Sequence, residues 1–136
     1  MKKYINYAFG YAIAAMVGGV FFREFTKFNG FEGVTTLGKV HTHLFMLGMV
    51  MMLLVAIFAS LTSVTSQKNW KAFMVTYNVG VSLASIMMVV RGVTQVLGTQ
   101  LSSGLNAAIS GISGIAHILV AVGMVLFFLM LRKSAK

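Results

Sequence analysis

Long apolar stretches alternate with short polar segments along the chain. The apolar stretches cover residues 4–22, 38–61, 72–98 and 106–131. Each is close to or longer than the ~20 residues that an α-helix needs to cross ~30 Å of hydrocarbon. The chain contains no proline, as suits uninterrupted helices that pair their backbone groups internally. The pattern predicts an all-α integral membrane protein with a single transmembrane domain over residues 1–136.

The segments between the apolar stretches are short, which favours an antiparallel four-helix bundle. The longest, residues 23–37, contains the turn-forming sequence FNGFEG. The first stretch follows two lysines and resembles a secretory signal, but it is longer than the ~7–15 apolar residues of a signal sequence. We therefore expect it to be retained as the first helix.

Small residues at helical spacing mark the faces expected to contact neighbouring helices. The predicted contact face of the second helix consists of His41, Phe45, Gly48, Met52, Ala56 and Ala59. That of the fourth helix consists of Ser110, Gly114, His117, Ala121 and Met124.

Basic residues lie mainly at the predicted helix ends. The formal net charge is +9, yet this placement indicates membrane topology and argues against a nucleic-acid partner. One side of the predicted bundle has only Arg23, Lys27 and Lys39, diluted by Glu24 and Glu32. The other side carries Lys2, Lys3, Lys68, Lys71, Arg132, Lys133 and Lys136. Because cytoplasmic loops are enriched in Lys and Arg, both termini are predicted to be cytoplasmic, N-in and C-in.

The predicted spans contain few ionisable side chains: His41, His43, Arg91 and His117. Such groups are costly in hydrocarbon and usually face a partner or the bundle interior. At ~1.5 Å per residue, Arg91 lies ~30 Å, His43 ~28 Å, His41 ~32 Å and His117 ~22 Å from the cytoplasmic helix ends. All four are therefore expected in the outer half of the bundle.

The histidines predict a b-type haem between the second and fourth helices. Bundle cores commonly hold cofactors, and imidazole is a standard axial ligand of haem iron. Gly48 and Gly114 are expected to leave room for a flat macrocycle. Arg91, or Arg23 at the end of the first helix, is expected to pair with the haem propionates.

The residues leave open whether His41 or His43 would join His117. His41 shares a face with Gly48, whereas the depth of His43 is closer to that of His117. His41 and His43 are two residues apart, which is a rotation of about 200° around the helix axis, so they cannot share one face.

A copper site is an alternative to haem. The His-x-His pair is followed by four thioethers, and imidazole with thioether is a ligand set that selects Cu(I). These thioethers belong to Met46, Met49, Met51 and Met52.

Two further interpretations need no cofactor. A proton or small-solute path could use His117, Arg91 and Gln95 as polar steps, although no acidic residue lies within a span to support proton coupling. Alternatively, His41 and His43 lie at the membrane interface and His117 bonds to Ser82, Ser85 or a carbonyl. The chain would then act through contacts with partner proteins.

Other catalytic arrangements are excluded by composition. The chain has no cysteine for a nucleophile or thiolate metal site, no Asp for a Ser-His-Asp triad, and no glycine-rich phosphate loop. Histidine or a cofactor would have to carry any acid–base or redox chemistry, so a catalytic activity of the chain's own is not predicted.

The four-span layout and the sequence KVHTHLFMLGM, residues 39–49, resemble a family of small bacterial membrane proteins of unknown function. This resemblance implies a multi-pass protein of the bacterial cytoplasmic membrane. We expect its partners to be the lipid bilayer, further copies of the chain, and a redox protein or quinone.

The segments HLFMLGM and HILVAVGM are also similar to the haem-ligating helices of haem–copper oxidase subunit I. That similarity implies a low-spin b-type haem, with His41 or His43 and His117 as axial ligands. Electron transfer, or haem sensing and handling, would be its use. The chain lacks the additional helices and the multi-histidine copper site of an oxidase, so oxygen reduction is not implied.

Overall fold

The structure, a computed structural model, describes residues 1–135, so that Lys136, one of the predicted cytoplasmic charges, lies outside it. Within that range the chain forms four long helices and no strand. All four are long and apolar enough to cross a membrane. The all-α, four-span prediction is confirmed. The elements are α1 (Lys2–Phe28), α2 (Leu37–His43), η1 (Leu44–Val50), α3 (Met51–Leu61), η2 (Val64–Ser66), α4 (Trp70–Val96) and α5 (Ser103–Ser134).

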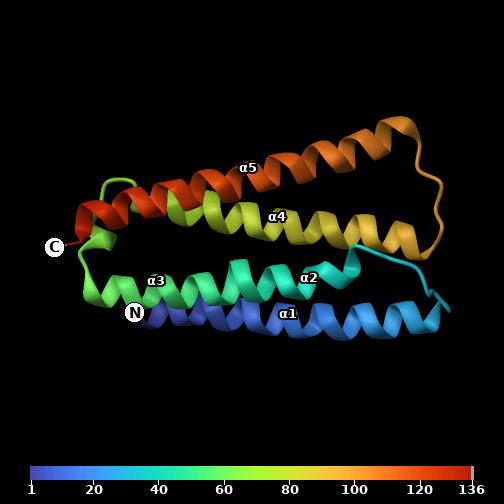
Figure 1. Cartoon of the computed structure of the whole chain (residues 1–136), viewed down its shortest axis with the longest axis horizontal. Coiled ribbons are helices and arrows are strands. Elements are labelled where there is room, and N and C mark those ends of the chain that lie inside the picture. The colour runs from blue at the N-terminus through green and yellow to red at the C-terminus, as the bar shows by residue number, and fades with distance from the viewer. Residues whose placement is uncertain (136) are drawn as a thin grey trace.

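The helices form an antiparallel bundle of two pairs (Figure 1). Helix α1 packs along the continuous helix made of α2, η1 and α3, and α4 packs along α5. Both termini lie at one end of the bundle, and the α1–α2 and α4–α5 connections lie at the other, which we call the distal end. Termini on the same side agree with an even number of spans, while the cytoplasmic placement of that side remains a prediction.

Helix α1 extends beyond its predicted end at residue 22 and stops at Phe28. Charged residues interrupt the apolar stretch there, but they do not interrupt helical hydrogen bonding. The helix ends where the Asn29 Nδ2 donates to the Phe25 carbonyl oxygen at 2.8 Å and Gly30 adopts a positive φ of 58°. Hydropathy therefore predicted the helix but missed where it ends.

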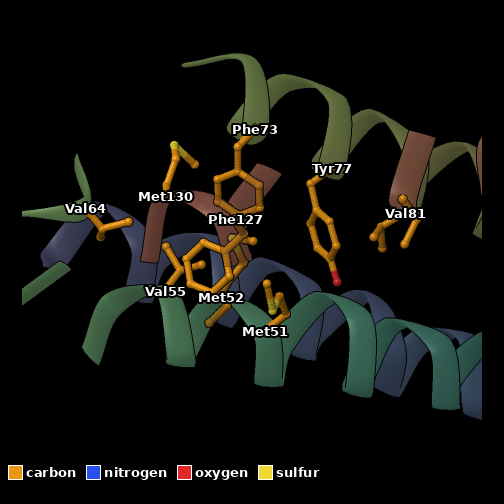
Figure 2. Packing of buried hydrophobic residues seen from close by; sticks show 11 residues of the cluster. Met51, Met52, Val55, Val64, Phe73, Tyr77, Val81, Phe127 and Met130 are labelled. Atoms are coloured by element: carbon orange, nitrogen blue, oxygen red, sulfur yellow. The ribbon is translucent and has the colours of Figure 1, made fainter. Parts of the chain in front are cut away.

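The main apolar core lies in the half of the bundle near the termini. Phe73 on α4 stacks on Phe127 of α5 with ring centroids 5.0 Å apart, and Met52 and Val55 of α3 are fully buried. Figure 2 shows these side chains meeting between α3, α4 and α5. The distal half holds a smaller apolar cluster built on Ala15, Val40 and Leu44.

Helix α5 contacts α4 through a different face from the predicted one. Gly80 and Gly123 permit this approach, because a Cβ on Gly80 would lie 2.7 Å from the Val120 backbone N and one on Gly123 would lie 2.8 Å from the Tyr77 Cβ. Most of the predicted face is exposed instead, as at Ser110, Gly114, His117 and Ala121. The prediction was wrong because α5 has small residues on two faces and the one containing the histidine was assigned to the interior.

The second membrane-crossing helix changes its winding directly after His43. The seven residues of η1 form a π-helix, which closes its hydrogen bonds over five residues and so holds more residues per turn than an α-helix. The Tyr77 hydroxyl of α4 donates to the Leu47 carbonyl oxygen of η1 at 2.9 Å. The side chain of Tyr77 is fully buried, and this bond therefore joins the π-helical segment to the core.

Replacing Tyr77 with phenylalanine is expected to lower the free energy of unfolding by about 1 kcal/mol, the net contribution of a typical hydrogen bond. The change leaves the Leu47 carbonyl without this donor and keeps the ring. Denaturation in mixed detergent micelles, followed by circular dichroism, measures the effect. Tyr7→Phe on the exposed surface of α1 is the matched control. Equal stability of the two variants would contradict a role for the bond.

Candidate cofactor site

An open pocket of about 470 Å³ lies between α2, α4 and α5 in the distal half of the bundle. Its size falls within the ~300–1,000 Å³ typical of small-molecule and cofactor sites. We call it the distal pocket. It is lined by Thr36, Lys39, His43, Met87, Met88, Arg91, Ser110, Ser113 and His117.

The start of α2 is fixed against α4 beside this pocket. The Thr35 hydroxyl donates to the Gly92 carbonyl oxygen at 3.0 Å, and the Thr36 hydroxyl donates to that of Met88 at 2.8 Å. The Thr36 backbone N–H donates to the Gln95 Oε1 at 2.8 Å. These bonds fix the start of α2, about two helical turns before His43, against α4.

His43 and His117 line the distal pocket from different helices, α2 and α5. The His43 Nδ1 lies 3.0 Å from the Lys39 carbonyl oxygen, and the His117 Nδ1 lies 2.7 Å from that of Ser113. A carbonyl oxygen can only accept, so each Nδ1 carries the proton and each Nε2 presents a lone pair. Metal-ligating histidines are commonly oriented in this way.

His41 is directed away from the distal pocket and towards α1. A Cβ built on Gly19 would lie 3.7 Å from the Cβ and Cγ of His41. Its Nδ1 is buried and has no hydrogen-bond partner within residues 1–135. Of the two candidates on this helix, His43 is therefore the one that shares a pocket with His117.

The two glycines predicted to leave room for a macrocycle do not line the distal pocket. Gly48 faces α1, where the Tyr11 ring occupies the space that a Cβ would need. Gly114 lies on the exposed surface of α5, and a Cβ there would meet no atom within 4 Å. The pocket is lined instead by other residues of α2, α4 and α5 and by Thr36.

Arg91 lines the distal pocket and joins α4 to α5. Its guanidinium donates to the Asn106 Oδ1 and, at 2.7 Å, to the Ser110 Oγ. Lys39 supplies a second cation, and none of the side chains lining the pocket is acidic. The pocket is thus suited to anionic groups such as carboxylates, which form charge-assisted hydrogen bonds with guanidinium. Arg23 does not line it and pairs instead with Glu24 at 2.8 Å on the exposed end of α1.

The four methionines predicted as copper ligands lie elsewhere. Met51 and Met52 are buried in the core, and neither Met46 nor Met49 lines the distal pocket. No group of three or more His, Asp or Glu residues in the described part of the chain could hold a metal ion. The distal pocket holds two imidazoles, those of His43 and His117.

The sequence matches a family described as proteins of unknown function, DUF2871, over residues 1–134. The chain belongs to the DUF2871 family. No curated protein and no solved structure matches it. The likeness of this DUF2871 protein to haem–copper oxidase helices therefore stays a prediction.

Several residues that line the pocket of the DUF2871 protein were not predicted from its sequence as site residues: Thr36, Lys39, Met87, Met88 and Ser113. A signal for two of them exists, since Lys39 and Ser113 each lie four residues before a pocket histidine. That spacing places their carbonyl oxygens under the imidazole on the same helix face. Met87 and Met88 lie one helical turn before Arg91 and could have been found by the same spacing.

Proposed function

We propose that this DUF2871 protein binds a b-type haem in the distal pocket, with His43 and His117 as axial ligands. One observation carries the proposal. Imidazoles from α2 and α5 line the same pocket, and each donates its Nδ1–H to its own helix, which leaves Nε2 available for iron. Bound haem would supply one-electron chemistry, and two imidazole ligands fill both axial positions.

The other pocket residues fit this cofactor. Arg91 and Lys39 would hold the propionates by charge-assisted hydrogen bonds. The bonds from Arg91 to Asn106 and Ser110 hold the guanidinium in the wall of the pocket. Met87 and Met88 would pack against the macrocycle, since thioether side chains adapt to aromatic surfaces.

We propose electron transfer, or haem sensing and handling, as the use of this site in the bacterial cytoplasmic membrane. No lining residue is a carboxylic acid that could act as a general acid or base. The side chain of His117 is exposed in a single chain, so a bound haem would present an edge to its surroundings. A further copy of the chain or a redox protein would cover that edge.

The visible absorption spectrum of the purified protein tests the proposal. After expression with adequate haem supply, we expect a Soret band that shifts on reduction with dithionite and sharp bands at longer wavelength, the signature of a low-spin b-type haem. Absence of a Soret band would overturn the haem assignment.

Metal analysis of the same sample tests a second candidate. The two histidines with Met87 and Met88 form a nitrogen and sulfur donor set that Cu(I) accepts. Stoichiometric copper in a haem-free sample would assign the pocket to copper. A colourless, metal-free protein would favour action through partner contacts alone.

A further inference from the structure

A second cavity, about 400 Å³ in volume, lies between α1, the second helix and α4. Its walls are mainly apolar, with Val17 and Gly18 on one side and Val40 and Leu44 on another. We call it the apolar groove. It shares no lining residue with the distal pocket.

Ser85 of α4 lines the apolar groove. Its side chain is only 6% exposed, and its Oγ has no hydrogen-bond partner in the described part of the chain. Buried hydroxyls in proteins are nearly always hydrogen-bonded, and each exception needs an explanation. A ligand oxygen entering the groove would give this hydroxyl a partner after a rotation about the Cα–Cβ bond.

The depth of Ser85 limits the class of ligand. At ~1.5 Å per residue, Ser85 lies ~22 Å from the Trp70 end of α4 and ~16 Å from the Val96 end. It is therefore close to the middle of a ~30 Å hydrocarbon layer. Phospholipid ester carbonyls lie at the interface, and their acyl chains bring no acceptor to this depth. A ligand that pairs with Ser85 at this depth would be a largely apolar, neutral molecule that carries its own oxygen into the bilayer.

We infer that the apolar groove binds the ring of a membrane-soluble quinone or quinol, with the Ser85 hydroxyl donating to a ring oxygen. The groove contains no charged side chain, as suits a neutral ring. Tyr11 lines it as well, and its hydroxyl already donates to the Asn78 Oδ1 at 2.9 Å. The phenol oxygen can thus accept a hydrogen bond from a quinol hydroxyl.

Binding of decylubiquinone to the haem-free, full-length protein in detergent micelles tests this inference. The quinone that stays with the protein through size-exclusion chromatography is extracted and quantified. We expect saturable, stoichiometric binding. Ala14→Phe, which fills the groove from the exposed surface of α1, is expected to abolish it, and Ile13→Phe on the same surface outside the groove is the matched control.

A milder pair of variants tests the hydrogen bond itself. Ser85→Ala is expected to weaken binding about threefold to tenfold, the effect of one lost hydrogen bond. The control is Thr76→Val on α4, because the Thr76 hydroxyl bonds to the Ala72 carbonyl outside the groove. This pair keeps the inference testable if Ala14→Phe folds poorly by circular dichroism.

Decylbenzene and phosphatidylglycerol, added as competitors, separate the quinone from an ordinary lipid chain. Neither is expected to displace decylubiquinone at equal concentration, because neither places an oxygen at the depth of Ser85. Equal competition by either one, or equal binding by the Ser85→Ala and Thr76→Val variants, would overturn the inference. Because haem-free protein is used, failure of the haem proposal would leave this result unchanged.

Discussion

Replacing His117 with alanine is expected to abolish the Soret band of the haem-loaded protein. The change removes one of the two imidazoles that line the distal pocket. Loss of an outer partner of a metal ligand costs about 10–100-fold in affinity, and loss of the ligand itself is expected to cost more. His43→Ala should give the same result for the same reason. Haem content per protein, from absorbance after purification, measures both.

His41→Ala is the matched control for these variants. His41 is the same residue type, lies two positions from His43 and faces α1 instead of the distal pocket. We therefore expect the His41→Ala protein to keep its haem. If His41→Ala abolished the Soret band and His43→Ala did not, the axial ligand on α2 would be His41 and not His43. Unchanged spectra for all three variants would show that no histidine holds the iron.

The largest expected effect on stability comes from Gly80→Val. A Cβ on Gly80 would lie 2.7 Å from the Val120 backbone N and 3.0 Å from the Ala116 carbonyl oxygen. Backbone atoms cannot turn aside as a flexible side chain can, so α4 and α5 would have to separate. Overpacking of this kind costs about 1–3 kcal/mol and sometimes more. We expect about 3 kcal/mol, measured by unfolding in mixed micelles.

Gly111→Val on α5 provides the comparison for Gly80→Val. It introduces the same side chain into a helix at a position where a Cβ meets nothing within 4 Å. Its effect is expected to stay within about 0.5 kcal/mol, as for most surface substitutions. If both variants lost the same stability, valine itself and not the helix contact would be responsible.

Hydropathy was sufficient to predict the four helices and their antiparallel order, because crossing a bilayer imposes length and backbone pairing on each segment. Helix faces were harder to predict. Helix α5 has small residues both at Gly114 and at Ala116 and Gly123, and only the shape of α4 decides which side is buried. Depth was the better guide to the pocket histidine, because the face shared by His41 and Gly48 contacts α1.

The orientation of the imidazoles could not be predicted from side-chain chemistry. The acceptors are the backbone carbonyl oxygens of Lys39 and Ser113. Because every residue has such a carbonyl, only the spacing of four residues to the histidine could indicate them. The orphan hydroxyl of Ser85 was equally hidden, since a serine in a helix can usually bond within its own helix. Both features depend on rotamers and neighbours that become visible only in the folded chain.

The winding of the π-helical segment decides in which direction His43 points, whereas the packing of α3 does not depend on it. A π turn holds one residue more than the α turn it replaces. If the same seven residues wound as an α-helix, everything before them would turn by about 100° relative to α3, because the extra residue would add its own rotation. The core side chains of α3 would stay in place, and the side chain of His43 would point away from the distal pocket. The direction of a polar ring is thus set by the pitch of seven residues, LFMLGMV, none of which has a polar side chain.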